Sequence, residues 1–383
     1  MKIPFHKVDI TGQEIKGVIR AVKSGWWTMG PKTIEFERRF RNYVGSKHAI
    51  AVNSCTAAMH LALDAIGLKE GDEVIVPAIT FTATAEVVCY FKAKPILIDI
   101  RRDTLNIDVS KIESKITSKT KAIIPVHYGG QPVDLDMIKK IAKKHNLFVI
   151  EDAAHALPAW YKNKKIGTLS DMTCFSFYVT KTLATGEGGM ITTNNKRWAD
   201  KMKIMRLHGM NKDAWKRYSK TGVWFYDVME AGFKYNTTDI NAALGLAQLK
   251  RLETMWRKRK RIARRYSEAF KSIDGVACPT IDDYTETSWH LYVIKLNLDS
   301  LKIGRNLFIK ELGKRGISSS VHFIPLYKHT FYKNLLRIRS SQFPESEYAY
   351  KRIISLPIYP SMGQEEVDRV IWEVKDVVEK NKK

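Results

Sequence analysis

From residue 48 onward, short apolar segments rich in Val, Ile and Leu alternate with longer segments whose apolar residues recur at helical spacing. The strand-like segments are residues 49–52, 73–77, 94–99, 122–127, 148–152, 172–176 and 190–193. Helical patterns at residues 56–65, 82–91 and 134–145 separate the earlier ones. This alternation predicts an α/β fold, in which a mostly parallel seven-stranded sheet carries helices on both faces. Ligands of such sheets bind at the carboxyl ends of the strands.

The length of the chain and the rest of its pattern predict a second domain. With 383 residues, the chain is longer than one compact core usually requires. The other helical patterns span residues 11–24, 32–44, 239–270, 304–316 and 364–380, and further β runs span residues 288–296 and 317–323. We therefore expect a large domain over residues 1–240, a connecting long helix over 241–270 and a smaller α+β domain over 271–383.

The composition excludes several classes of protein. No apolar run approaches the roughly 20 residues of a membrane span, and the first residues lack a signal-peptide core. We therefore expect a cytoplasmic protein with no membrane segment. The four cysteines are scattered without Cys-x-x-Cys spacing, which predicts buried thiols, and no metal site is expected.

The net charge of +24 makes nucleic-acid binding a possibility to consider. The densest basic run, residues 257–261, lies within the long helical pattern, where a solvated face accounts for it. No helix-turn-helix, zinc-finger or RNA-binding signature accompanies this run. We therefore regard a nucleic-acid partner as unsupported, and the charge would also suit an anionic small substrate such as a nucleotide sugar.

Lys181 lies on a glycine-rich connection between two strand-like segments. It follows Ser176 by five residues and precedes Gly186, Gly188 and Gly189. Taken alone, it is an ordinary surface lysine, since lysine is usually exposed. In a dry and basic pocket its pKa would fall, and the amine would become the nucleophile that Schiff-base chemistry requires.

Two other strand ends carry groups that a ligand could use. Residues 53–58 (Asn-Ser-Cys-Thr-Ala-Ala) join a strand to a helix, and form either an anion cradle or a plain N-cap by Ser54 or Thr56. Phe81 follows the next strand, where it either stacks on a flat ring or packs in the core.

Asp152 ends a third apolar strand, and His155 follows three residues later. A buried carboxylate is costly unless it is paired, and a cationic heterocycle nitrogen would pair it. The alternative is a helix-capping Asp beside a hydrogen-bonded His. A carboxylate, a stacking ring, a phosphate cradle and a lysine are together what a pyridine cofactor with a phosphate and an aldehyde requires.

The chain resembles the DegT/DnrJ/EryC1/StrS family of sugar aminotransferases over nearly its whole length. These are pyridoxal-phosphate (PLP) enzymes of the aspartate aminotransferase type I fold. The resemblance rests on residues 25–31, 53–58, 151–155, 176–181, 186–189, 208–209, 232–236, 239–243, 321–325 and 356–360. Within the family, residues 208–215 resemble the branch that makes 4-amino sugars on UDP, such as UDP-4-amino-4-deoxy-L-arabinose aminotransferases.

The resemblance implies roles for single residues. Lys181 matches the lysine that bonds to the cofactor aldehyde and then shuttles a proton, and Asp152 matches the partner of the pyridinium nitrogen. His155 matches the residue at the ring's hydroxyl side, and Phe81 matches the stacking aromatic ring. The residues that match the phosphate cradle are Thr56, Ala57 and Ser176.

The family pattern also implies a homodimer with shared active sites, because a partner residue usually completes the phosphate cradle. The matching segment here leaves Lys234 and Asn236 as alternatives for that contact. The chain departs from the pattern at Cys55, where a Ser, Gly or Ala is usual, and at Tyr178, where a His is common.

The expected reaction moves the amino group of L-glutamate to a keto group of a nucleotide-linked sugar, such as a UDP-4-keto sugar. The product would serve amino-sugar, cell-surface polysaccharide or lipid A-type biosynthesis. One alternative is a non-catalytic or regulatory member of the same fold. Another is a PLP-dependent sugar dehydratase, but those members carry His in place of the lysine, so Lys181 favours transamination. The sequence leaves open the sugar, the nucleotide and the keto position, C3 or C4.

Overall fold

The computed structural model describes residues 2–211 and 225–383, so part of the stretch 208–215 lies outside the described residues. Its central sheet has the strand order β1-β9-β8-β5-β4-β2-β3, which confirms the seven-stranded sheet predicted from the sequence. All neighbouring pairs are parallel except the two that β9 makes. The strands are β1 (His48–Val52), β2 (Glu73–Pro77), β3 (Lys94–Ile98), β4 (Thr120–Ile123), β5 (Phe148–Asp152), β8 (Met172–Ser176) and β9 (Gly189–Thr193).

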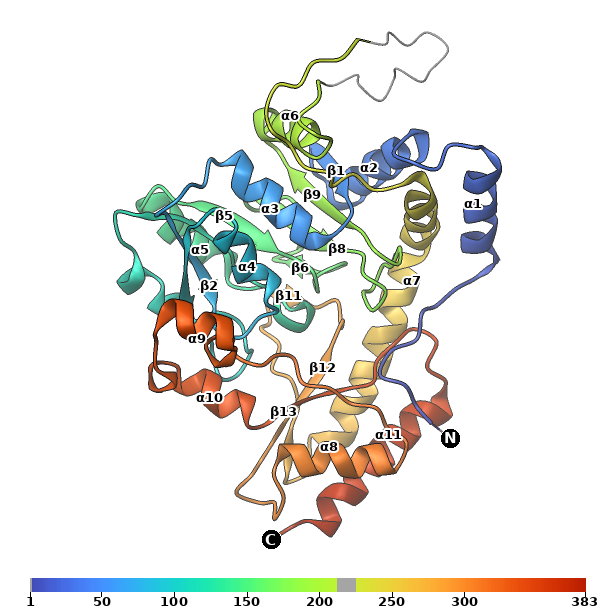
Figure 1. The fold of residues 1–383 in the computed structure, drawn as a ribbon. Helices are drawn as coiled ribbons and strands as arrows, with labels where there is room; N and C mark the ends of the chain where they lie inside the picture. The colour runs from blue at the N-terminus through green and yellow to red at the C-terminus, as the bar shows by residue number, and fades with distance from the viewer. Residues whose placement is uncertain (1, 212–224) are drawn as a thin grey trace.

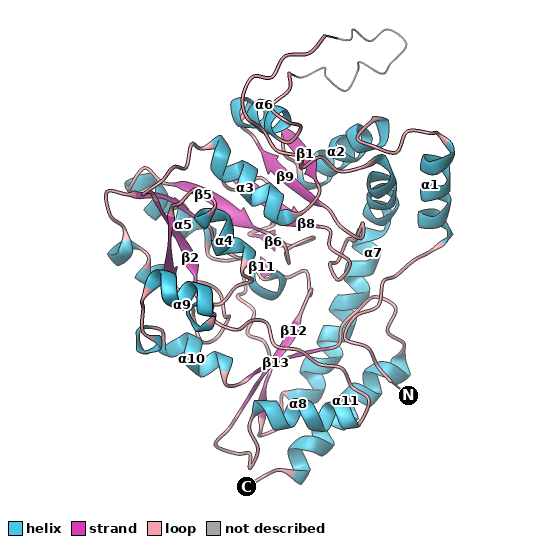
Figure 2. Ribbon diagram, in the orientation of Figure 1, coloured by secondary structure: helices cyan, strands magenta, loops and turns pink. Residues whose placement is uncertain are grey.

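Helices surround this sheet and build the rest of the molecule (Figures 1 and 2). The α-helices are α1 (Gly12–Lys23), α2 (Pro31–Val44), α3 (Cys55–Ala65), α4 (Ala83–Cys89), α5 (Leu135–Lys144), α6 (Lys196–Met205), α7 (Asp239–Phe270), α8 (Arg305–Lys314), α9 (Thr330–Leu336), α10 (Pro344–Tyr350) and α11 (Gln364–Lys380). Short 3-10 helices are η1 (Val109–Lys111), η2 (Glu113–Lys115), η3 (Tyr128–Gly130), η5 (Leu326–Lys328) and η6 (Ser340–Gln342).

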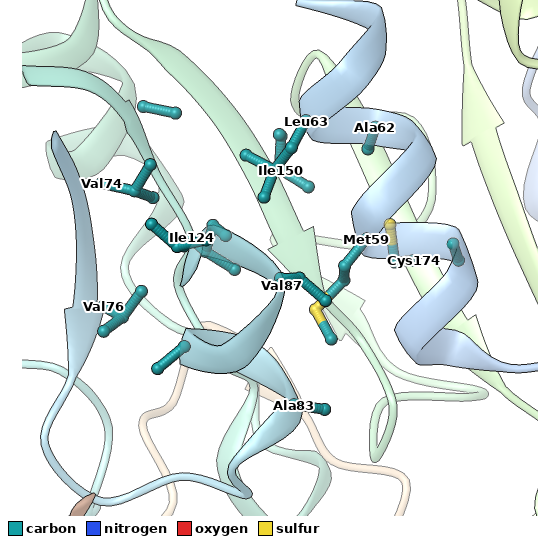
Figure 3. Packing of buried hydrophobic residues seen from close by; sticks show 14 of the residues in the cluster. Met59, Ala62, Leu63, Val74, Val76, Ala83, Val87, Ile124, Ile150 and Cys174 are labelled. Carbon is teal, nitrogen blue, oxygen red and sulfur yellow. The ribbon is translucent and has the colours of Figure 1, made fainter. Parts of the chain in front are cut away.

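The two faces of the central sheet bury separate apolar clusters. One face packs against α3, α4 and α6, and Figure 3 shows Leu63 of α3 beside Ile150 of β5 and Met59 of α3 directed toward Val87 of α4. The other face packs against α2, α5 and the first half of α7. Because helices cover both faces, both sides of each strand are buried. This explains why the strand segments of the sequence are almost continuously apolar.

The 32-residue helix α7 joins this layered domain to a second apolar cluster. Its first half packs on the central sheet, and its second half packs with α8 and α11 on a small sheet. That sheet has the order β10-β12-β13, and a separate small sheet has the order β11-β6-β7. These strands are β6 (Trp160–Tyr161), β7 (Lys164–Lys165), β10 (Val276–Ala277), β11 (Thr285–Glu286), β12 (Tyr292–Leu296) and β13 (Ile353–Leu356).

The strand expected at residues 317–323 does not form in the described chain, so that expectation was wrong. Ser320 makes only an isolated bridge to Ser355 of β13. Beyond this bridge His322 contacts the small sheet only through its side chain, whose Nδ1 lies 2.8 Å from Ser355 Oγ. The chain then reaches the large domain, where the Leu326 N–H donates to the Ala78 carbonyl at 2.9 Å. Hydrogen bonding to the large domain therefore replaces continued strand pairing.

Contacts cross the expected boundaries between the domains. Tyr327, Tyr332 and Phe343, which follow residue 271, pack in the same apolar cluster as α3 and α4. The division at residues 240 and 270 therefore stays a prediction. Among the helices of the described residues, none is both long enough and apolar enough to cross a membrane.

Candidate active site

A cavity of about 620 Å³ lies at the carboxyl edge of the central sheet, within the range of about 300–1,000 Å³ typical of small-molecule sites. Asp152 ends β5 and Ser176 ends β8 at this edge, and α3 begins just after β1. The sequence-predicted residues that line the cavity are Thr56, Phe81, Asp152, His155, Ser176 and Lys181. Residues from four separate connections of the sheet therefore meet at one place.

Asp152 is buried at the end of β5, and both of its carboxylate oxygens accept hydrogen bonds. Thr84 Oγ1 donates to Oδ2 at 2.8 Å, and the Ala154 backbone N–H donates to Oδ1 at 3.1 Å. Burial raises the pKa of Asp152, whereas these two hydrogen bonds and the charge of Lys181 oppose the increase. No helix begins at this position, so the helix-capping alternative is wrong.

Lys181 lies on a tight connection between β8 and β9. Its backbone N–H donates to the Tyr178 carbonyl at 2.9 Å, and the Phe177 N–H donates to the Gly188 carbonyl at 2.8 Å. Gly186 has a φ of +84°, a left-handed conformation that favours glycine. The side chain is largely buried, and burial lowers its pKa to about 8, although Cys55 and Asp152 act in the opposite direction. The amine is therefore far easier to deprotonate than an exposed lysine.

The first turn of α3 adjoins the same loop. Ser54 Oγ accepts a hydrogen bond from the Ala57 N–H at 3.0 Å, so Ser54 is the N-cap of α3. Of the two residues expected as a possible N-cap, Ser54 and Thr56, the structure therefore selects Ser54. Ala57 does not line the cavity, whereas Ser54, Cys55 and Thr56 do. The free N–H groups at the start of a helix, and its dipole, favour an anion at this point.

Gly189 allows β9 to pack directly beneath this helix start. It pairs with Val52 at the end of β1 and with Ser176 at the end of β8. A Cβ atom at Gly189 would lie 2.4 Å from the Ser54 carbonyl oxygen and 2.8 Å from the Cys55 nitrogen. Because both contacts are to backbone, no larger residue fits without displacing the start of α3.

Phe81 and His155 face the cavity in different ways. Phe81 is 58% exposed, so the core-packing alternative is wrong, and its ring is free to cover a flat ligand. His155 is buried, and its Nδ1 has no hydrogen-bond partner among the described residues. The alternative of a fully hydrogen-bonded His is therefore wrong as well, and an atom of a ligand would complete this contact.

These residues fit PLP. Asp152 offers a buried carboxylate for a ring nitrogen, His155 has an unpartnered Nδ1 and Phe81 has an exposed ring. Thr56 lies at a helix start suited to a phosphate, and Lys181 carries an amine with a lowered pKa.

Lys234 and Asn236 are not among the residues that line the cavity in the described chain. The segment between them runs beside the start of α3, where the Asn53 N–H donates to the Tyr235 carbonyl at 2.8 Å. Asn236 Oδ1 is buried without a hydrogen-bond partner among the described residues. Their expected contact with a partner subunit stays a prediction.

Several residues that line the cavity were not predicted from the sequence, among them Phe5, His6, His290 and His322. His322 lies within residues 321–325, a segment used only for the family resemblance. His290 lies within the β run predicted at residues 288–296 and belongs to no spacing motif, and Phe5 and His6 lie ahead of the first predicted helix. Only the tertiary fold brings these segments together.

Comparisons with known proteins show the family to which the chain belongs. Residues 8–375 match the DegT/DnrJ/EryC1/StrS aminotransferase family. An uncharacterized protein of Methanocaldococcus jannaschii, MJ1066, is 52% identical over 380 residues, which cover 99% of this chain and 98% of that protein. The spore coat polysaccharide biosynthesis protein SpsC of Bacillus subtilis is 47% identical over 377 residues, which cover 98% and 97% of the two chains.

The fold agrees with solved structures of Spr1654 from Streptococcus pneumoniae, described as a sugar aminotransferase. Its PMP form superposes with a TM-score of 0.93 at 38% identity, covering 99% of both chains. Its PLP form gives a TM-score of 0.92 at 37% identity over the same share of both chains. The chain therefore belongs to the DegT/DnrJ/EryC1/StrS aminotransferase family, with PLP as its cofactor and the PLP-dependent transferase fold.

Proposed function

We propose that this protein moves the amino group of L-glutamate to a keto group of a nucleotide-linked sugar, with a UDP-4-keto sugar as the expected acceptor. The observation that carries the proposal is the meeting of Lys181 and Asp152 in one cavity of an aminotransferase fold. The names of SpsC and Spr1654 support a sugar as the acceptor. The product would enter amino-sugar, cell-surface polysaccharide or lipid A-type biosynthesis.

The roles proposed for the residues follow from their chemistry. When bound, PLP supplies an electron sink for the negative charge that develops at the substrate carbon. Asp152 keeps the ring nitrogen protonated through its carboxylate, which Thr84 and the Ala154 N–H orient. Lys181 Nζ removes the proton at the substrate carbon and later returns it, which suits an amine whose pKa is about 8. The lysine in this position favours transamination over the dehydratase alternative.

The remaining cofactor contacts surround the ring and the phosphate. Phe81 covers one face of the ring, and His155 donates from or accepts at its free Nδ1 on the hydroxyl side. The phosphate would lie at the start of α3, where Thr56 and Ser176 line the cavity. Ala57, the third residue expected in the cradle, lies outside the lining, and its N–H donates to Ser54 Oγ.

A second copy of the chain completes the site in this proposal, with Lys234 or Asn236 reaching the partner's phosphate. An apolar stripe on α1 supports a dimer, because Ile15, Ile19 and Val22 are exposed at helical spacing. Exposed apolar patches of this kind commonly mark interfaces between proteins.

A panel of keto-sugar nucleotides tests the reaction. The PLP-loaded protein is incubated with L-glutamate and, in turn, with UDP- and dTDP-linked 3-keto and 4-keto sugars, and the products are read by mass. Conversion of one keto sugar to its amine, with equal formation of 2-oxoglutarate, is expected. If no member of the panel gains an amino group while the cofactor is bound, the proposal fails.

A further inference from the structure

The N-terminal segment forms part of the cavity wall. The Ile3 N–H donates to the Gly316 carbonyl at 2.8 Å, and the Ser318 N–H donates back to Ile3 at 3.0 Å. In Figure 1 this blue segment runs from the small domain past α7 toward α1. The Phe5 ring stacks on His322 with centroids 5.5 Å apart, so this part of the chain is held at the cavity.

His6 and His290 line the cavity and have no role in the proposed chemistry. His6 Nε2 and His290 Nδ1 are both buried without a hydrogen-bond partner in the described part of the chain. A buried polar atom without a partner destabilises the folded state, so native proteins rarely leave one without a ligand or water. The His290 ring lies 4.4 Å from that of His155, so it continues the polar wall beyond the proposed cofactor contact.

Both imidazoles favour the neutral form. Burial lowers the pKa of His6 to about 4 and that of His290 well below its usual value. The nearby Arg259 guanidinium, which donates to the Ile358 carbonyl at 2.7 Å, acts in the same direction. A neutral imidazole has one N–H donor and one acceptor nitrogen.

The unpartnered nitrogens of these neutral imidazoles favour some ligand groups over others. A hydroxyl both donates and accepts, and it therefore suits a neutral imidazole, whereas a carboxylate or phosphate only accepts. The described residues contain no group of three or more His, Cys, Asp or Glu placed to hold a metal ion. The rings of Phe5, Phe81 and Phe323 also line the cavity and offer apolar faces to a sugar ring.

We propose that His6 and His290 bind hydroxyl groups of the keto-sugar acceptor, which makes the N-terminal segment a determinant of sugar specificity. The inference rests on the proposed function and names the part of the cavity that recognises its acceptor. One ring nitrogen of His6 donates to the backbone of Val179, which leaves the unpartnered Nε2 as the acceptor in the neutral ring. The carboxylates of the amino donor only accept hydrogen bonds, so they cannot partner this nitrogen.

The two half-reactions separate this role from a structural one. In His6→Phe the ring stays planar and both nitrogens are lost, and Lys7→Ala serves as the neighbouring exposed control. Cofactor absorbance follows the PLP form with L-glutamate and, separately, the PMP form with the best keto sugar of the panel. In His6→Phe we expect the half-saturating sugar concentration to rise about tenfold, because one to two hydrogen bonds to the sugar are lost. The glutamate half-reaction should be unchanged.

A binding measurement gives a second readout. Calorimetry with UDP-N-acetylglucosamine, a non-reacting probe, is expected to show about tenfold weaker binding to His6→Phe than to the wild type or Lys7→Ala. His6→Asn keeps a donor and an acceptor, so it should recover part of the affinity, and His290→Phe tests the second imidazole if His6→Phe does not fold.

Three outcomes overturn the inference. Unchanged sugar half-saturation in His6→Phe excludes the contact, and equal loss in both half-reactions assigns a structural role to the segment. If the wild-type protein aminates no keto sugar, the proposed function itself is wrong. If the wild type is active and His6→Phe behaves like it, only the inference about His6 is wrong.

Discussion

Thr84 Oγ1 donates a hydrogen bond of 2.8 Å to Asp152 Oδ2, which joins the first turn of α4 to the end of β5. Thr80 Oγ1 lies 2.7 Å from Thr84 Oγ1, so a chain of two hydroxyls leads to the buried carboxylate. Hydrogen bonds to a charged group stabilise it more than those between neutral groups. Thr84 holds the carboxylate that is proposed to bind the cofactor nitrogen, but no sequence motif pointed to Thr84.

Thr84→Val is expected to weaken cofactor binding about tenfold, because loss of this donor raises the pKa of Asp152 further and leaves its charge less stabilised. Equilibrium binding of PLP, followed by absorbance, measures the change. Thr192→Val is the matched control, since Thr192 is a buried hydroxyl that donates to the Gly167 carbonyl away from the cavity. Equal losses in the two variants would refute a specific role for Thr84.

Lys181→Met is expected to stabilise the cofactor-free protein at pH 7. Burial lowers the pKa of Lys181 from 10.5 to about 8, so folding at pH 7 carries the cost of a buried ammonium group. This cost, about 3 kcal/mol, is complete below pH 8 and disappears as the pH rises through 10.5, where the amine is neutral in both states. Urea unfolding at pH 7 and pH 10 measures it. A gain that stayed constant with pH would contradict this origin.

Gly189→Ala is expected to destabilise the protein by about 3 kcal/mol and to weaken phosphate binding at the start of α3. Its Cβ would overlap the Ser54 carbonyl, which belongs to the backbone and cannot swing away. Gly313→Ala is the control, because a Cβ at this position in α8 meets nothing within 4 Å and should raise stability by about 0.5–1 kcal/mol. Thermal unfolding and PLP titration separate the two effects.

Asp239→Ala is expected to cost about 3 kcal/mol of stability, because Asp239 supplies the N-cap contacts of α2 from more than 200 residues away. Its Oδ1 accepts from the N–H groups of Gly30 at 2.8 Å and Thr33 at 2.9 Å, and Oδ2 accepts from that of Lys32 at 2.9 Å. Asp283→Ala, at an exposed aspartate, should leave the urea midpoint unchanged. Similar midpoints for both variants would contradict the capping role.

Ile19→Asp is expected to dissociate the proposed dimer, because it places a charge in the exposed apolar stripe of α1. Sedimentation velocity measures the oligomeric state, and amino transfer should fall with the loss of the dimer. Trp372→Asp is the control, since Trp372 is also an exposed apolar residue and lies on α11, outside the stripe. A dimer that survives Ile19→Asp would place the interface elsewhere.

The sequence predicted the sheet, its covering helices and the chemistry-bearing strand ends, because each depends on local periodicity or on a short motif. Asp152, Ser176 and Lys181 lie within such motifs, and the parallel strands bring them to one edge. The sequence could not place His6 or His290 at the cavity. Their positions depend on pairing of Ile3 with the small domain and on the course of the chain before β12, which no local pattern encodes.

The visible spectrum of the purified protein tests the role of Lys181 most directly. The protein is loaded with PLP, and its absorbance is recorded before and after addition of L-glutamate and again after addition of a keto-sugar nucleotide. We expect a yellow band that glutamate bleaches and the keto sugar restores, and that is lost in Lys181→Ala. A wild-type protein that stays colourless, or a Lys181→Ala variant with the same spectrum and the same response to glutamate, would contradict it.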